Sequence, residues 1–234
     1  MKKSKVTWLG SLCVARVFAR ATTLGRATTF ALLVVPSWGA AACATSTERG
    51  VVRPSASGKE YGGPLQNTRE LGAEFVWEQE ITARYGDRAQ SFGAVLQHAD
   101  GALTVLGLTP FNTRAFSIEQ RGYEFSFHNY VGRKLPFDPK SILIDIHRTF
   151  FVGMSAPRSD GEHVTLELGE RRVDVWRSGK LVRRSFERVA EPGKKIEVDY
   201  GAGYAPGVPP ARALFENHWY GYALEVVTTS ATEL

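Results

Sequence analysis

Residues 116–127 read Phe-Ser-Ile-Glu-Gln-Arg-Gly-Tyr-Glu-Phe-Ser-Phe, two runs of alternating apolar and polar side chains separated by a turn at Arg121-Gly122. Alternation with a period of two places the apolar side chains on one face of a β-strand. A short turn between two such strands makes an antiparallel hairpin. The stretch therefore predicts a sheet with one buried face.

The same pattern recurs along most of the chain. Turn residues at Gly86-Asp87, Asp100-Gly101 and Ser178-Gly179 separate further strand-like runs. These runs cover 75–85, 91–98, 102–108, 164–168, 172–177, 181–189, 195–200 and 219–229. Roughly nine to eleven strands in succession predict a mainly β (α+β) fold, and an antiparallel sheet of that size tends to curl. We therefore expect a curved antiparallel sheet.

One segment changes its period and predicts a helix. Asp138-Pro139 is a typical N-cap followed by proline at the first helical position. Apolar residues then recur at spacings of three and four through residues 138–152. We expect this helix to present one strongly apolar face to the sheet.

The first 42 residues have the parts of a secretory signal. Six Lys and Arg residues and no Asp or Glu precede Cys43, and a short apolar run from Phe30 ends in Ala40-Ala41-Ala42-Cys43. A basic region, a short apolar segment and small residues at the cut make up such a signal. A cysteine directly after the small residues resembles a bacterial lipoprotein signal. We predict a signal peptide at 1–42 and lipidation of Cys43.

Two alternatives are open for this segment. The first is a permanent transmembrane helix, which the apolar run does not favour, because the run has about ten residues and such a helix needs about 20. A cleaved signal with an incidental cysteine is the closer alternative, because Ala40 stands where lipoprotein signals usually carry Leu. Against it, cleavage would leave Cys43 as a lone thiol in an oxidising compartment. Ala44 in place of Asp favours the periplasmic face of the outer membrane.

The positive charge of the chain belongs to this leader. The sequence has 29 Lys and Arg residues against 24 Asp and Glu, a net charge of +5, and without residues 1–42 the net charge is −1. Binding of nucleic acid relies on a basic surface. We therefore expect no nucleic-acid partner.

The rest of the chain divides into a tether and one domain. Residues 43–70 are rich in Ser, Thr, Gly, Pro and charge and show no apolar periodicity. Such a segment buries too little apolar surface to fold alone. We expect a flexible tether at 43–70 and a β domain at 71–234.

The sequence carries no motif of an enzyme. The five histidines (His98, His128, His147, His163 and His218) do not fall at metal-ligand spacings, and neither a Gly-x-Ser-x-Gly sequence nor a phosphate-binding loop occurs. We expect no catalytic residue, no metal and no cofactor. The remaining enzymatic possibility is a hydrolase or an isomerase, and the residues to consider for it are Asp145, His147 and Arg148. Asp145 and His147, two residues apart, should lie on different faces of the helix.

Aromatic and aliphatic side chains are plentiful in the predicted elements. They make an ordinary core, or they line a cavity between a curled sheet and its helix that holds an apolar ligand. The candidate lining residues are Phe92, Leu96, Phe116, Ile118, Phe125, Phe127, Ile142, Ile146 and Phe150. The loop with Leu108 and Phe111 is a candidate for contact with a membrane or ligand, and a buried corner of a hairpin would explain it equally well.

Several stretches resemble a family of small Gram-negative lipoproteins of unknown function that is grouped with the LolA/LolB-like lipoprotein carriers. The matching stretches are Leu135-Pro136 with residues 142–147, residues 106–114, residues 171–182 and residues 217–226. His147 and residues 150–152 depart from the family pattern. The resemblance implies an unclosed antiparallel β-barrel with a helical lid and a cavity for acyl chains, and it carries no catalytic residue.

These observations predict a non-catalytic outer-membrane lipoprotein. Facing the periplasm, it would bind or transfer a lipid or acylated ligand, with the membrane contacted through its N-terminal lipid and with export or assembly proteins as further partners. The alternative is a structural or assembly lipoprotein that uses a sheet face to bind a protein and has no ligand cavity.

Overall fold

The computed structural model describes residues 47–51, 61–63, 65–132, 135 and 137–234. The predicted signal peptide and the predicted lipidation site, Cys43, lie outside the described residues. The described part forms one twelve-stranded sheet in which every neighbouring pair of strands is antiparallel.

The sheet is open, with β1 and β7 at its two edges. Its strand order is β1-β6-β5-β4-β3-β2-β12-β11-β10-β9-β8-β7. The strands are β1 (Thr47–Val51), β2 (Phe75–Tyr85), β3 (Arg88–Ala99), β4 (Ala102–Leu108), β5 (Arg114–Arg121), β6 (Glu124–Asn129), β7 (Gly161–Glu167), β8 (Glu170–Arg177), β9 (Lys180–Arg188), β10 (Lys195–Tyr204), β11 (Arg212–Asn217) and β12 (Tyr222–Glu233). The predicted mainly β, curved and unclosed antiparallel sheet is confirmed.

The hairpins form where alternation and turn chemistry coincide. In β2, Phe75, Trp77 and Gln79 are buried on the concave face while the residues between them are more exposed. The predicted turns at Asp100-Gly101 and Ser178-Gly179 have two residues with positive φ, as a type I′ hairpin turn requires. Leu168-Gly169 makes the same turn, although leucine gives no turn signal in the sequence.

The sequence predicts too few strands. The described residues contain twelve, and the two that were not predicted are β1 and β11. Strand β11 follows a Gly/Pro-rich loop, and its short sequence gives no separate strand signal after that loop. The last strand begins at Tyr222 instead of residue 219. Each of the two missed strands is short and pairs with a longer strand, β1 with β6 at one edge and β11 with β10 and β12 inside the sheet.

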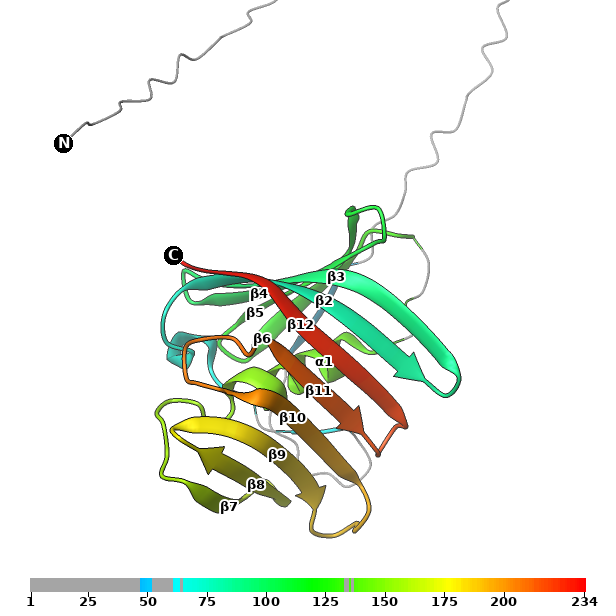
Figure 1. The fold of residues 1–234 in the computed structure, drawn as a ribbon. Helices are drawn as coiled ribbons and strands as arrows, with labels where there is room; N and C mark the ends of the chain where they lie inside the picture. Colours follow the sequence, from blue (N-terminus) through cyan, green and yellow to red (C-terminus); the bar gives the residue numbers. More distant parts are fainter. Residues whose placement is uncertain (1–46, 52–60, 64, 133–134, 136) are drawn as a thin grey trace, which may run out of the picture. The chain divides into compact units, whose positions relative to one another are not determined.

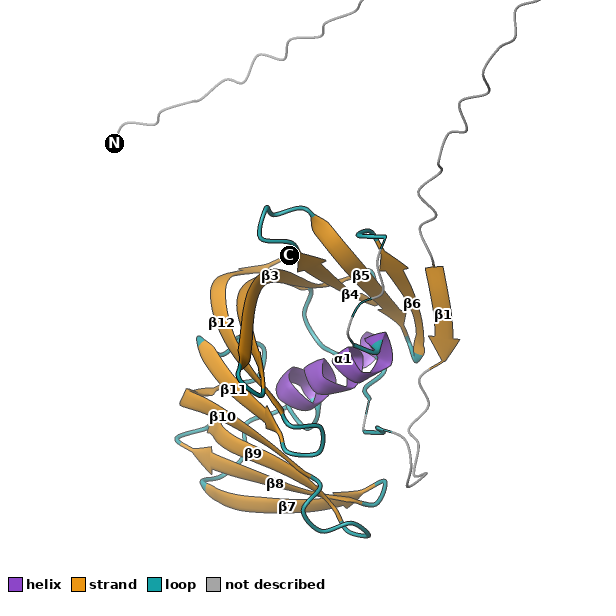
Figure 2. Cartoon of the chain, turned by 90° about the vertical axis from the view of Figure 1, so that its right-hand side faces the viewer, coloured by secondary structure: helices purple, strands orange, loops and turns teal. Residues whose placement is uncertain are grey.

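The sheet curls around a helical segment on its concave side (Figure 2). Helix α1 (Pro139–Ile146) continues into a π-helical turn, η2 (His147–Phe151), so the prediction of a helix over 138–152 is confirmed. Asp138 caps it by accepting a hydrogen bond from the Lys140 backbone at 3.1 Å. Among the described residues no helix has the length and apolar character needed to cross a membrane.

Part of the predicted tether is folded. Strand β1 pairs with β6, and Tyr61 and Leu65 belong to the hydrophobic core. In the short helix η1 (Thr68–Glu70), the Thr68 hydroxyl donates to the carbonyl of Gly101 at 2.5 Å and accepts from the backbone of Gly122 at 2.8 Å. Strand pairing, two isolated core side chains and side-chain hydrogen bonds hold this segment, which has no apolar periodicity. The folded region therefore begins before the expected boundary at residue 71.

Candidate functional site

The concave face of the sheet and the helix on it form the candidate site. Aromatic side chains join them. The Phe150 ring lies edge-on to that of Trp77 of β2, with 5.7 Å between the ring centroids. The Phe151 ring lies beside those of Trp77 and Phe75, with centroid distances of 6.2 and 6.1 Å. The helix faces the sheet with its apolar side, as its sequence pattern predicts.

The C-terminal end of the helix is also bound to the sheet through its backbone. The last carbonyl groups of a helix have no partner within it. Here three buried side chains of β9 and β10 donate to them at 2.5 to 3.0 Å: Arg184 to Arg148, Tyr200 to Thr149 and Tyr204 to Phe150. These contacts fix the position of η2.

Three buried ion pairs lie in the same region, one of which joins Arg172 to Asp174 at 3.2 Å. Arg184 binds Asp174 through two hydrogen bonds of 2.7 and 3.1 Å. Arg148 contacts Glu170 at 2.5 Å and donates to the carbonyl of Gly62 at 2.6 Å. Removing one member of such a pair leaves a buried charge, which typically costs about 3–5 kcal/mol. The C-terminal half of the helix is therefore firmly attached to the sheet.

Asp145 joins three parts of the chain. It accepts hydrogen bonds from the hydroxyl groups of Tyr61 and Tyr222, and Tyr61 in turn accepts from Asn217 at 2.9 Å. Burial raises the pKa of the Asp145 carboxyl to about 6, against the opposing effect of the two tyrosine hydrogen bonds and of the Arg148 charge. Asp145 thus connects the N-terminal segment, the helix and β12.

His147 points to the other side of the helix and uses both of its ring nitrogens. Nδ1 accepts from the Gln66 backbone at 3.1 Å, so Nε2 carries the proton and donates to Gln120 Oε1 at 2.7 Å. Burial lowers the pKa of His147 to about 3, and the ring is neutral.

The three residues considered for catalysis do not converge on one point. Asp145 and His147 lie on different faces of the helix, as predicted, whereas Asp145 and Arg148 both contact Tyr61, Asp145 at the tyrosine hydroxyl group and Arg148 over the tyrosine ring at 4.9 Å. All three form buried hydrogen bonds between the helix and other parts of the chain, and these bonds hold the helix in place.

The nine cavity candidates divide by burial. Five belong to the hydrophobic core: Leu96, Phe116, Ile118, Phe127 and Phe150. The other four are half-buried: Phe92, Phe125, Ile142 and Ile146. The structure places both groups on the concave side. Position on one face does not by itself define a cavity, and the cavity that these residues would line stays a prediction.

Phe92 lies near one end of the concave face, and Phe125 lies level with Phe75 and His98 toward the other end. Along β2 the inner face passes from buried Trp77 to half-buried Ile81, which lies opposite Phe92 of β3. Leu224 of β12 is a neighbour on the same face and is also half-buried. We call Ile81, Phe92 and Leu224 the inner strip. Ile81 and Phe92 belong to the long β2–β3 hairpin, which can be followed in Figure 1, and Leu224 belongs to the adjacent strand β12.

The helix adds apolar side chains of the same character. Ile142 and Ile146 precede Phe150 at intervals of four, which places all three on one helix face. Phe150 lies against Trp77 of β2, whereas Ile142 and Ile146 are only half-buried. The helix and the inner strip thus expose apolar surface that continues from the core.

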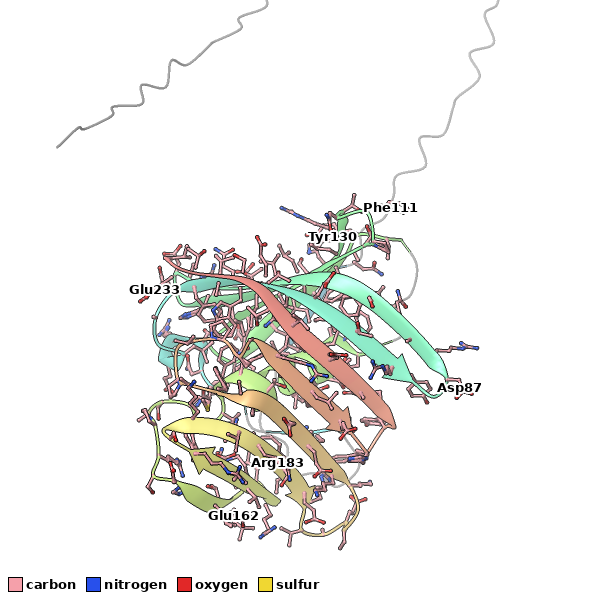
Figure 3. The ribbon with its side chains drawn as sticks, in the orientation of Figure 1. Asp87, Phe111, Tyr130, Glu162, Arg183 and Glu233 are labelled. Carbon is pink, nitrogen blue, oxygen red and sulfur yellow. The ribbon has the colours of Figure 1, made fainter. Side chains whose placement is uncertain are left out.

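The loop between β4 and β5 presents one of its two candidates to solvent. Phe111 is 87% exposed at the loop tip, where Figure 3 labels it. The Thr109 and Thr113 hydroxyl groups are 2.7 Å apart, and the Thr109 hydroxyl accepts from the Phe111 backbone at 3.2 Å. Leu108 instead packs beside Gly93 on the outer side of β3. The loop therefore holds Phe111 outward.

One group of potential metal ligands occurs among the described residues. Glu197, Glu216 and His218 place one ligand atom each within 4.8 Å of the others. Their sequence spacing gave no hint of this, because pairing of β10 with β11 brings them together. Glu197 is already bound by Lys195 at 2.8 Å and by His218 at 3.2 Å.

Sequence reasoning missed most of the polar residues that position the helix. Tyr61 lies in a segment without periodicity, and Arg184, Tyr200 and Tyr204 read as ordinary strand residues. Each has its partner 36 to 84 residues away. For Arg184, Tyr200 and Tyr204 the inward position in the strand alternation was the available signal, since a polar group on a buried face needs a partner. Tyr61 gave no such signal.

These features define a class of protein whose fold is a curved, open antiparallel sheet with a helix on its concave face. Residues 76–230, more than half of the chain, match the model of DUF3261, a family described as a protein of unknown function. The chain belongs to the DUF3261 family. Among curated proteins, none matches this sequence.

Solved structures with a similar arrangement have low sequence identity to the chain. One is a domain from Vibrio parahaemolyticus with a proposed role in outer membrane lipoprotein sorting, at 9% identity over 71% of this chain and 88% of that one, with a TM-score of 0.44. A LolA superfamily protein from Nitrosomonas europaea has 10% identity over 73% and 94%, with a TM-score of 0.41. A DUF1329 family protein from Desulfovibrio piger has 10% identity over 71% and 88%, with a TM-score of 0.45.

Proposed function

We propose that this protein is an outer-membrane lipoprotein that faces the periplasm and binds or transfers a lipid or acylated ligand without catalysis. Cys43 would carry the lipid anchor. The apolar chain of the ligand would lie on the inner strip and against Ile142 and Ile146 of the helix.

The observation that carries this proposal is the half-buried apolar surface on the concave face. Ile81 and Leu224 are half-buried and pack against the core, and half-buried Phe92 lies opposite Ile81. Burial of an acyl chain yields about 0.8 kcal/mol for each methylene group. About ten methylene groups would therefore supply the roughly 8 kcal/mol of micromolar affinity, before the costs of ordering.

The anchor and the exposed loop fit a protein that works at a membrane. The leader ends in the Ala-Ala-Ala-Cys sequence, and Phe111 is held outward at a loop tip. Labelling cells with radioactive palmitate tests the anchor: the wild type should be labelled and Cys43→Ser should not. Equal labelling of both would refute lipidation at Cys43.

Ligand binding is tested with the purified full chain and a fluorescent fatty acid. Phe92→Glu and Leu224→Glu place a charge in the inner strip and should abolish uptake of the probe, because an unpaired carboxylate on an apolar ligand is costly. Val208→Glu is the matched control, since Val208 is 62% exposed in the β10–β11 connection. Unchanged uptake by the strip variants, with folding verified by circular dichroism, would refute the site.

Native mass spectrometry of the same protein addresses the second candidate function. A structural or assembly lipoprotein without a ligand is favoured by the filled aromatic core, in which Trp77, Phe150 and Phe151 pack together. A co-purified lipid that Phe92→Glu releases supports the carrier. Absence of lipid together with absence of probe uptake supports the assembly role.

A further inference from the structure

Strand β7 is an open edge of the sheet. It stands last in the strand order, and among the strands that the structure describes it pairs with β8 alone. Soluble proteins usually protect an edge with lysine, proline, a bulge or a covering segment, because unpaired backbone groups invite another strand. Strand β7 contains no Lys or Pro, and its pairing with β8 runs without a register shift.

The outer face of this edge is apolar. Val164 is 53% exposed and Leu166 is 69% exposed, and Leu168 in the following turn is 37% exposed. Val164 lies opposite Val173 of β8, which extends the apolar surface inward from the edge. Glu162, at the start of the strand, is labelled in Figure 3.

The turn after β7 determines which backbone groups are free. Leu168 and Gly169 have φ of 53° and 76°, the two positive values of a type I′ turn, so Glu167 and Glu170 form a hydrogen-bonded pair. Bonding alternates along an antiparallel pair. Residues 163, 165 and 167 therefore bond to β8, while the N–H and C=O groups of residues 162, 164 and 166 point to the free edge.

We propose that this edge is an interface between two copies of the chain, which pair antiparallel about a two-fold axis through Thr165. In this register Val164 of one copy and Leu166 of the second are a hydrogen-bonded pair, and the symmetry repeats the pair on the other side of the axis. Thr165 meets Thr165 of the second copy as a pair without mutual hydrogen bonds.

Complementarity of the side chains selects the second copy as the partner. On the concave face the register sets His163 opposite Glu167 of the second copy, twice, and on the outer face it sets valine against leucine, twice. In this register Glu162 faces Leu168, which lies in the turn beyond the strand, whereas the neighbouring register, centred on Val164, would oppose Glu162 to Leu166 within the strand. The sequence of β7 thus fits itself in the register centred on Thr165.

Disulfide trapping tests the register in the full chain with Cys13 and Cys43 replaced by Ser. Cysteines in Thr165→Cys should cross-link with each other on mild oxidation, since directly opposite residues without mutual hydrogen bonds are close enough for a disulfide. Val164→Cys should not cross-link alone but should cross-link with Leu166→Cys in a mixture. Cross-linking of Val164→Cys alone without that of Thr165→Cys would overturn the register.

Sedimentation velocity over a range of concentrations tests the interface itself. The cysteine-free chain should form a dimer, and Leu166→Lys should raise its dissociation constant on the order of tenfold or more. Tyr85→Lys is the matched control, because Tyr85 is 66% exposed at the far end of β2. A monomer at every concentration, or a dimer that both substitutions weaken equally, would overturn the proposal.

Discussion

The buried carboxyl of Asp145 should make the stability of the protein depend on pH. Burial raises its pKa to about 6 from an ordinary value of 3.8. A group whose pKa is higher in the folded state binds its proton more tightly there, so its contribution to stability is complete below about pH 4 and is lost as the pH rises to about 6. At about 1.4 kcal/mol for each pH unit, that contribution is about 3 kcal/mol.

The assay is urea unfolding of the wild type and of Asp145→Asn at several values between pH 4 and pH 7.5. The variant lacks this titration, so its free energy of unfolding should gain on that of the wild type by about 3 kcal/mol across the interval. Asp199→Asn, which removes an exposed carboxylate, is the control for the loss of one charge. A difference between Asp145→Asn and the wild type that does not change with pH would refute the reasoning. A change of opposite sign would mean that the tyrosine hydrogen bonds outweigh burial.

Three further substitutions test contacts around the helix and within the sheet. Arg148→Met should cost about 3–5 kcal/mol because Glu170 loses its buried partner, and the added change Glu170→Leu should recover much of that loss in chemical denaturation. Tyr61→Phe should cost about 1–3 kcal/mol by removing a donor to Asp145, whereas Tyr220→Phe, at an exposed ring, should leave the unfolding midpoint unchanged. Gly107→Ala should lower the melting temperature strongly, since a Cβ there would lie 2.1 Å from the Phe116 ring, while Gly93→Ala, 3.3 Å from Leu108, should have a smaller effect.

The elements predicted well are those whose signals are local. The strand over residues 75–85 and the turn at Asp100-Gly101 follow from alternation and from residues that accept positive φ, and the helix follows from Asp138-Pro139 and its spacing. Strand β11 was missed because its neighbours in the sequence are a Gly/Pro-rich loop and a turn. Its pairing with β10 and β12, which no local pattern encodes, makes it a strand.

The candidate site was predictable only in its apolar half. Alternation identifies inward residues such as Phe92 and Ile118, and the structure places them on the concave side. The polar half depends on partners distant in the sequence, such as Tyr61 with Asp145 and Arg184 with the Arg148 carbonyl. No local pattern in a single sequence indicates such pairs, since their residue types are also common on exposed strand faces.

The distribution of polar contacts limits how the helix could move to admit a ligand. Displacing the whole helix would leave Glu170 buried without Arg148 and would deprive Tyr200 of its acceptor on Thr149, a loss of several kcal/mol. Ile142 and Ile146 are only half-buried, and the contacts described for η2 begin at its first residues. Ile146 is the last residue of α1 and lies between Asp145 and His147, whose hydrogen bonds hold that part of the helix. An opening confined to the first turn of α1 would expose Ile142 alone, while these hydrogen bonds and the ion pairs stay intact. A ligand on the inner strip should therefore displace the beginning of the helix and leave η2 in place. Amide hydrogen exchange with and without the fatty-acid probe would distinguish the two, because exchange that increases equally over α1 and η2 contradicts a partial opening.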